Sequence, residues 1–429
     1  MKMHINISDF KNATLAMFGF IFYVLLLDYS YSTIIYKIYG YYGYENIHDV
    51  SQIFRHWIMI IAISPLMIKT YTKKNVSSVI IIVLVLVSFI PNMILIKHSN
   101  YNAEYAYLTF AYWFTLLGMN LILPSIKYSI NKPNRIISLA VITIICLTVL
   151  YVSITKANFR IHLTFSDVYV LRVEARSFSL PLFLGYFGTA AHTVLPIAFI
   201  YSLVEKKKYS ALLLAIVIML NFGIAGSKSV VLLLFIATLG YIFSKRISDS
   251  ANITWGFGIL IAIAVVEHSI LKSNNLTFFT LFRTLFLPGI ITYNYYDYFS
   301  INDFDYLKQG VLKIFGAKSI YSDNIAFMIG DYMSSVRGGR ANNGLFSDAY
   351  SNVGTIGVVF FPIIIVLLLK TIERSVNGLD KRLIFIVAVT TAMNLLSVPV
   401  FTSVATGGLF LMTIYLLYLP RFNSEQVSR

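Results

Sequence analysis

The chain has 429 residues, of which 58% are hydrophobic and 12% are charged. Globular domains average about 45–50% apolar and about 25% charged residues, so this composition excludes an ordinary soluble enzyme and indicates a polytopic membrane protein. The excess of 34 Lys and Arg over 19 Asp and Glu is expected to orient the chain and to contact anionic lipid, because no basic, aromatic-interleaved soluble module that would bind nucleic acid is present.

Apolar runs of membrane-spanning length recur along the whole chain. The first, 12–36, is too long for a signal-peptide core and has no small-residue cleavage site after it, so we interpret it as a span. The predicted fold class is all-α, a single integral membrane bundle over 1–429. Its twelve predicted spans are 12–36, 53–70, 77–96, 105–126, 136–155, 180–204, 209–225, 228–244, 254–270, 355–372, 382–397 and 402–420.

Two local features refine this prediction. Between the last two spans, Val398, Pro399 and the stretch 402–408 indicate either a tight turn or a broken helix. The only cysteine, Cys146, lies inside an apolar run, which excludes a disulfide, a thiolate metal site and a water-exposed Cys nucleophile.

Basic residues set the expected orientation. They are concentrated in alternate short loops, such as 69–74, 127–135 and 206–208, so the positive-inside rule places both termini in the cytoplasm. Three polar features then share the outer side, and no inward loop is long enough for a nucleotide-binding domain. The three outer features are the loop 156–179, the turn 226–228 and the long loop 271–353, which we expect to be helical and to cover the active site.

The first outer loop carries a pair of arginines. On a helix, Arg172 and Arg176 lie four residues apart on one face, which would present two guanidinium groups to an anion such as a diphosphate. The alternative is a solvated helix in which Glu174 and Asp167 neutralise them.

The turn between spans seven and eight places Lys228 after Gly226 and Ser227. An ionisable residue just inside a membrane helix is a functional candidate, and the start of a helix offers free N–H groups to an anion. The alternative is that the lysine snorkels to lipid phosphate. A complete phosphate-loop motif is absent.

The long outer loop combines cations, aromatic rings and acids. Flat aromatic faces suit the C–H faces of sugar rings, and carboxylates accept hydrogen bonds from hydroxyl groups; the alternative is an aromatic belt at the lipid headgroups. Asp348, near the outer end of span ten, is either a helix-start acid or a base. The loop's other candidate residues are Arg283, Tyr293, Tyr295, Tyr296, Tyr298, Phe299, Asp297, Asp303, Asp305, Arg337 and Arg340.

Histidines are few, and His192, His162 and His268 are each more typical of packed or interfacial side chains than of ligands. No H-E-x-x-H motif occurs, and no D-x-D pair lies where a metal-dependent sugar-nucleotide transferase would need it, so we predict a metal-independent mechanism without a cofactor.

The order of these features resembles the Wzy-type oligosaccharide repeat-unit polymerases, or O-antigen polymerases. The resemblance runs from Asp167 to the C-terminus, and the position of Lys228 is often arginine in such proteins. Its pieces are Asp167–Arg172, which includes Tyr169; Gly226–Ser229; Arg283 with Phe286, Pro288 and Gly289; Tyr295–Phe299; and Asn343–Tyr350 with Asn352, Gly354 and Gly357.

This resemblance implies a GT-C-like glycosyltransferase at the outer, periplasmic face of the bacterial inner membrane. It would transfer a growing chain from undecaprenyl diphosphate to the non-reducing end of an incoming lipid-linked repeat unit, with a chain-length regulator as partner. Cations are needed because charge develops on the departing diphosphate. We expect Arg172, Arg176, Lys228 and Arg283 around the diphosphate, and Arg337 and Arg340 on the acceptor or chain.

A base must assist the attacking hydroxyl, and Glu174, Asp348 and His192 are the candidates. We expect sugar contacts from Tyr169, Tyr295, Tyr296, Tyr298, Asn343 and Tyr350. Two alternatives share the same lipid-linked substrate: an O-antigen ligase, which would use lipid A core as acceptor, and a flippase. A flippase would place cations in the middle of several spans and show two-bundle symmetry, whereas here the cations lie in outer loops.

Overall fold

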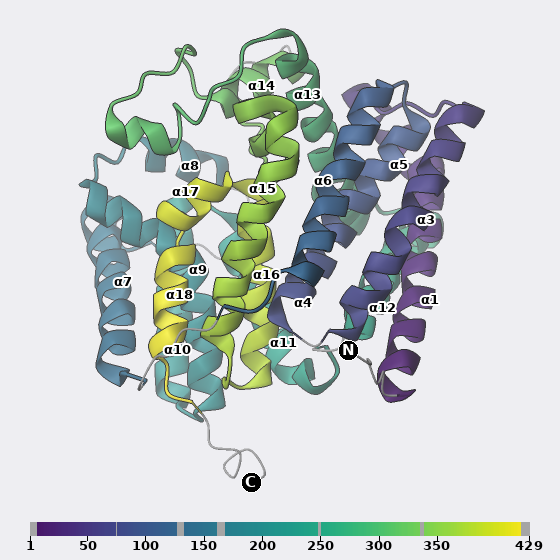
Figure 1. Ribbon diagram of the computed structural model, residues 1–429. Coiled ribbons are helices and arrows are strands. Elements are labelled where there is room, and N and C mark those ends of the chain that lie inside the picture. Colours follow the sequence, from purple (N-terminus) through teal and green to yellow (C-terminus); the bar gives the residue numbers. More distant parts are fainter. Residues whose placement is uncertain are drawn as a thin grey trace. The chain divides into compact units, whose positions relative to one another are not determined.

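The computed structural model describes residues 7–73, 75–126, 133–160, 168–247, 250–334 and 339–421, and every regular element in these ranges is a helix (Figure 1). The all-α prediction is therefore confirmed for this part of the chain. Seven helical segments within these ranges are long and apolar enough to cross a membrane. They are Asn12–Tyr42, Val50–Thr72, Val76–His98, Arg135–Lys156, Leu182–Val204, Ala251–Leu271 and Phe346–Val376.

A helix runs through each of the twelve apolar ranges predicted from the sequence. Three of the remaining apolar helices, Lys208–Ile224, Lys228–Phe243 and Leu409–Tyr418, are shorter than a full span. The chain is thus consistent with a polytopic helical membrane protein, and the number twelve stays a prediction.

The chain divides into two compact units. The first contains Met1–Pro124, Asp249–Leu369 and Leu395–Val400, and the second contains Ser125–Ser248, Lys370–Asn394 and Phe401–Arg429. Each unit therefore joins segments that are far apart in the sequence.

The helices of the first unit surround one buried span. In Val76–His98, 94% of the apolar window is buried, which is expected for a helix that is hydrophobic on all sides. Figure 1 shows α1 beside α3 and α12, and both of these helices pack against α1. The helices are α1 (Ile7–Ser30), η1 (Tyr31–Ile35), α2 (Tyr36–Tyr39), η2 (Gly40–Tyr42), α3 (Val50–Thr72), α4 (Val76–Leu84), η3 (Val85–Phe89), α5 (Ile90–His98), α6 (Ala103–Ile122), α12 (Ser250–Val266), η4 (Glu267–Leu271), η5 (Thr277–Phe286), α13 (Leu287–Ile301), η6 (Val311–Phe315), α14 (Ile325–Met333) and the first part of α15 (Phe346–Val376).

The long loop predicted over 271–353 is largely helical in its described part, because it contains η5, α13, η6, α14 and the start of α15. A side-chain cap starts α14 in this loop, and a similar cap starts α6 elsewhere in the first unit. Asn324 accepts a hydrogen bond from the Ala326 N–H at 3.0 Å at the start of α14, and Asn102 caps α6 in the same way through Glu104. Such caps satisfy backbone donors that a helix leaves unpaired in its first turn.

The second unit is a bundle in which α9 packs against α7, α10, α11 and α18. Its helices are α7 (Arg135–Lys156), α8 (Val168–Ser177), α9 (Leu182–Val204), α10 (Lys208–Ala225), α11 (Lys228–Ile247), α18 (Leu409–Tyr418), the end of α15, most of α16 (Lys381–Ser397) and of α17 (Val400–Ala405).

The chain between α17 and α18 is a broken helix, one of the two alternatives that the sequence left open. The N–H groups of Thr406 and Gly407 bond back to the Thr402 carbonyl at 2.9 and 2.7 Å, which ends α17. Gly408 then adopts φ 91°, and a Cβ on it would lie 2.8 Å from the Ala190 Cα of α9. Only glycine accommodates both the positive φ and this close approach.

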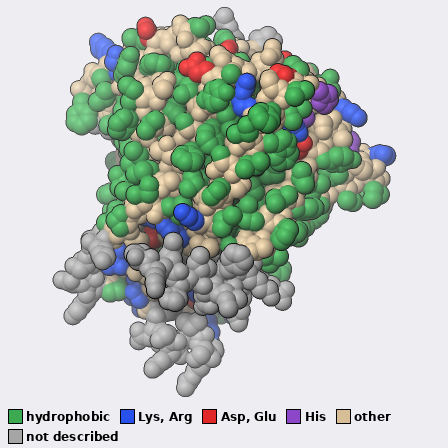
Figure 2. Space-filling model, turned by 45° about the vertical axis from the view of Figure 1, so that its right-hand side comes forward, with side chains coloured by type: hydrophobic (Ala, Val, Ile, Leu, Met, Phe, Trp, Pro, Cys, Tyr) green, Lys and Arg blue, Asp and Glu red, His purple; other side chains and the backbone are tan. Residues whose placement is uncertain are grey.

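Hydrophobic side chains make up much of the face drawn in Figure 2, in keeping with many large apolar residues that stay exposed, such as Phe18, Ile61, Leu147 and Phe360. Apolar surface on this scale is not stable in water and marks a contact with lipid or protein.

Candidate functional site

Helix α8 brings one predicted cation to the turn that carries another. The Arg172 Nε donates a hydrogen bond to the Gly226 carbonyl at 3.0 Å, and the side chain of Arg172 remains exposed. Gly226 ends α10 in the left-handed region, with φ 57°, and α11 starts two residues later at Lys228. Leu171, next to Arg172, is 2% exposed and anchors α8 to the bundle. The structure therefore places Arg172 against the α10–α11 turn.

The carboxylate of Glu174 is paired with a third arginine. Its Oε2 lies 2.6 Å from the Arg160 Nη2, and both side chains are about one-third exposed. Residues two apart on a helix point to different sides, so Glu174 faces away from Arg172. The sequence had left open whether Glu174 neutralises the α8 arginines, and the ion pair observed is with Arg160.

Two further predicted residues belong to α8. Arg176 lies one helical turn beyond Arg172, as expected, and Tyr169 lies in its first turn; the directions of these two side chains lie outside the described part of the structure. Asp167 and Arg337 also lie outside the described residues.

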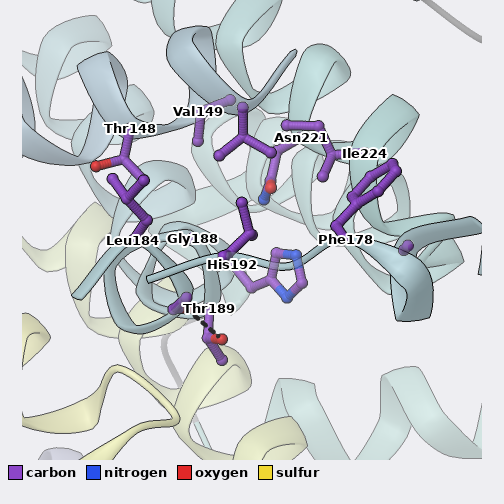
Figure 3. A pocket seen from close by; sticks show the side chains of 13 residues that line it. Thr148, Val149, Phe178, Leu184, Gly188, Thr189, His192, Asn221 and Ile224 are labelled. Carbon is purple, nitrogen blue, oxygen red and sulfur yellow. Dashed lines mark hydrogen bonds between the residues drawn. The ribbon is translucent and has the colours of Figure 1, made fainter. Parts of the chain in front are cut away.

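A cavity of about 240 Å³ opens between α7, α8, α9 and α10, under the helix that carries Arg172 (Figure 3). His192 of α9 lines it together with Asn221 of α10. The His192 Nε2 and the Asn221 Nδ2 are buried and have no hydrogen-bond partner among the described residues. The lining residues are Thr148, Val149, Val152, Ala175, Phe178, Leu180, Leu184, Gly185, Gly188, Thr189, His192, Asn221 and Ile224.

The predicted motif Asn343–Tyr350 forms a packed centre in the first unit. The Asn343 Nδ2 donates to the Pro288 carbonyl, to the Thr292 Oγ1 at 2.8 Å and to the Ser347 Oγ at 3.0 Å, which joins α13 to α15. The ring of Tyr350 lies 5.1 Å from that of Tyr296. Tyr296 and Tyr350, both predicted from the sequence as sugar-binding residues, are thus in contact in the structure.

Asp348 is buried at 4% exposure with both carboxylate oxygens engaged. Its Oδ1 accepts from the Asn352 Nδ2 at 2.9 Å, and its Oδ2 accepts from the Val400 N–H at 2.7 Å, where α17 begins. A carboxylate that binds the first N–H of a helix stabilises that helix start. In this structure Asp348 thus connects α15 to a segment 52 residues away.

The predicted aromatic residues of α13 are mostly internal. The Tyr295 hydroxyl donates to the Ala341 carbonyl at 3.1 Å, and the Tyr296 hydroxyl donates to the Glu104 Oε2 at 3.2 Å. Burial raises the pKa of both phenols above the ordinary value, so they are neutral donors at physiological pH. Tyr298 packs on the Tyr332 ring at 5.4 Å.

Replacing Tyr296 by phenylalanine is expected to lower the free energy of unfolding by about 1 kcal/mol, because the hydrogen bond to Glu104 is lost. Tyr298→Phe is the matched control on the same helix, since the Tyr298 hydroxyl has no hydrogen bond recorded within the described ranges. Thermal unfolding of the purified variants measures the difference, and equal melting temperatures would contradict it.

Two predicted cations of the first unit rest on aromatic rings. The Arg283 guanidinium lies 5.5 Å from the ring centre of Phe278, and that of Arg340 lies 4.5 Å from Phe327; both side chains are exposed. Both distances are within the range of a cation–π attraction, which helps to position these two guanidinium groups.

Sequence reasoning missed Asn221 and the ion cluster Asp28–Lys97–His98, in which the Asp28 carboxylate lies 2.6 Å from the Lys97 Nζ and 2.7 Å from the His98 Nε2. The sequence feature that could have identified these residues is a polar or charged side chain inside an apolar run. Within the described ranges, no three His, Cys, Asp or Glu residues come together as a metal site would require.

Comparison of the chain with protein-family models, with curated proteins and with solved structures gave no match. Inferences about function therefore depend on the residues themselves: an exposed arginine at the α10–α11 turn, and a cavity lined by two buried polar atoms, the His192 Nε2 and the Asn221 Nδ2, that have no partner among the described residues.

Proposed function

We propose that the chain is a Wzy-type polymerase of undecaprenyl-diphosphate-linked repeat units, a metal-independent GT-C-like glycosyltransferase with twelve spans. Its site would face the periplasm from the inner membrane. The observation that carries the proposal is the bond from Arg172 to the Gly226 carbonyl, because it holds an exposed guanidinium at the turn before Lys228 and above a ring-sized cavity.

In the proposed reaction, an acceptor hydroxyl oxygen forms a bond to the anomeric carbon of the donor chain. The bond from that carbon to the diphosphate oxygen breaks, and the electron pair leaves with the diphosphate. The hydroxyl proton passes to a base. Negative charge grows on the departing diphosphate during the reaction. A fixed guanidinium and an ammonium group therefore stabilise the transition state more than the ground state, which lowers the barrier.

The bond to Gly226 uses only the Nε–H of Arg172, so the terminal N–H groups of its fork are directed elsewhere and support a diphosphate contact. Lys228 adds charge without bidentate geometry. The roles of Arg283 at the diphosphate and of Arg340 on the acceptor or chain stay predictions. Asp348 is a less suited base than the sequence alone indicates, because both of its oxygens accept hydrogen bonds.

Deletion of the gene tests the function. We expect surface polysaccharide from the deletion strain to run on a gel as lipid A core that carries a single repeat unit, because units are still made and ligated but no longer joined. Complementation with the full chain should restore the long ladder. An unchanged ladder would exclude a polymerase, and bare core would indicate a ligase instead.

A further inference from the structure

The cavity of the second unit has the size of one ring. Its volume is about 240 Å³, and an apolar cavity of about 150 Å³ is known to hold benzene. A six-membered ring with its substituents therefore fits.

The cavity contains hydrogen-bonding groups that the protein leaves unused. Asn221 is 3% exposed, and neither its Nδ2 nor the Nε2 of His192 has a partner among the described residues. Figure 3 shows both side chains directed into the space between α7, α9 and α10. A buried polar group without a partner is costly, so such groups indicate a site where a ligand oxygen completes the hydrogen bonds.

The walls are apolar and lack full charges. Phe178, Leu184 and Ile224 are typical of them, and no Lys, Arg, Asp or Glu is present among the 13 residues that line the cavity. An ionised group would lose its hydration without gaining a counter-charge. The cavity therefore favours an uncharged ligand.

Helix register sets the depth of each group. Helices α9 and α10 pack together and are joined by 205–207, so they are antiparallel, and the start of α9 lies beside the end of α10. At about 1.5 Å per residue, His192 lies about 15 Å below the start of α9, and Asn221 lies about 6 Å below the end of α10. Leu184 and Ile224 are closer to these ends. The ligand thus needs apolar faces toward these helix ends and oxygens farther from them.

We propose that this cavity binds a single uncharged pyranose, the sugar at the non-reducing end of the acceptor. A pyranose ring has apolar C–H faces and hydroxyl edges, which match the apolar rim and the deep amide and imidazole. Only a terminal sugar has a free edge that enters a cavity of one ring. The inference rests on the proposed function and extends it to substrate specificity.

This assignment makes His192 a sugar-binding residue and not the base. With the acceptor's sugar in the cavity, His192 contacts that sugar and lies away from the anomeric carbon of the donor. The reacting hydroxyl then lies toward α8, the helix that carries Arg172 and supplies Ala175 to the wall; Phe178, which also lines the cavity, follows directly after this helix.

Glycines give a direct test of the cavity. A Cβ on Gly188, which lines it, would meet nothing within 4 Å, so Gly188→Leu fills the cavity without a clash. Gly256 of α12 is an exposed glycine with equally open surroundings, and Gly256→Leu is the matched control. The probes are glucose, galactose, rhamnose, N-acetylglucosamine and N-acetylgalactosamine, with glucuronate as the charged comparison.

Saturation-transfer NMR with the full chain in nanodiscs is the measurement. We expect at least one neutral sugar to give a signal that Gly188→Leu abolishes and Gly256→Leu preserves, and glucuronate to give none. The proposal is overturned if no neutral sugar of the panel gives a signal that depends on Gly188, or if glucuronate binds equally well.

The substitution Asn221→Leu distinguishes a role of Asn221 in sugar binding from a role in protein stability. It replaces a buried amide, whose Nδ2 has no partner among the described residues, by an apolar group of similar size, so we expect the melting temperature to be unchanged or higher while the sugar signal is lost. A lower melting temperature with retained sugar binding would show that Asn221 is only structural and would contradict the proposal. The binding result does not depend on the deletion phenotype, so failure of this inference and failure of the polymerase assignment are distinguishable.

Discussion

Arg172→Ala is expected to remove the long polysaccharide ladder from a complemented deletion strain and to lower the transfer rate about 100-fold, the scale observed when one fixed donor to a developing anion is lost. The Arg172 guanidinium is held by the Gly226 carbonyl, and alanine removes both this bond and the positive charge at the turn. Rate measurements with purified protein and lipid-linked repeat units, together with gels, give the result.

Arg135→Ala is the matched control, because Arg135 is an exposed arginine in the first turn of α7 within the same unit. It should leave the ladder unchanged. Arg172→Lys is expected to restore part of the rate, since lysine keeps the charge but loses the planar fork. A full-length ladder from Arg172→Ala at normal protein level would remove Arg172 from the site.

The helices were largely predictable because of the physics of the bilayer. A segment of about 20 apolar residues satisfies its backbone polar groups in lipid only as a helix, so apolar runs such as 136–155 and 180–204 predict helices directly. Which of these helices faces protein on all sides was predictable only in part. Val76–His98 has the highest mean hydropathy of the seven long segments, 3.0, but lipid and protein interior are both apolar, so a high hydropathy alone does not separate burial in protein from exposure to lipid.

The position of Arg172 at the α10–α11 turn was predictable in part. An arginine pair in one outer loop and a lysine after a Gly-Ser turn pointed to the right elements, but the contact between Arg172 and Gly226 depends on how α8 packs on α10. Asn221 was overlooked because a lone amide in an apolar run is usually satisfied by a neighbour. Only the three-dimensional arrangement shows that its Nδ2 has no partner in the described part of the chain.

Asp348 illustrates the limit of local patterns. Its position before an apolar run fits a helix-start acid or a base equally well, and the sequence left both open. The structure adds the Val400 N–H as a partner, from a segment that no nearby residue predicts. The same packing explains why the motif Asn343–Tyr350 is rich in small and polar residues: it holds α13, α15 and the segment Leu395–Val400 together.

Gly344→Ala is therefore expected to destabilise the protein by about 3 kcal/mol, the upper end of typical overpacking costs. A Cβ at this position would lie 2.1 Å from the Leu395 carbonyl oxygen and 2.7 Å from that of Val398. Both atoms belong to the backbone, which does not move aside as the tip of a side chain does. The N–H of Gly344 also bonds to the Leu396 carbonyl at 3.1 Å, so displacement of the chain would break this bond as well.

The control is Gly339→Ala, five residues earlier, where an added Cβ meets nothing within 4 Å and the residue is exposed. Thermal unfolding in detergent should show a clear drop in melting temperature for Gly344→Ala and little change for Gly339→Ala. Gly344 belongs to the motif Asn343–Tyr350, on which the proposed polymerase assignment partly rests, so the result tests the role of this motif. A drop in stability would assign its glycine to packing, whereas loss of polymer with unchanged stability would assign it to substrate contact.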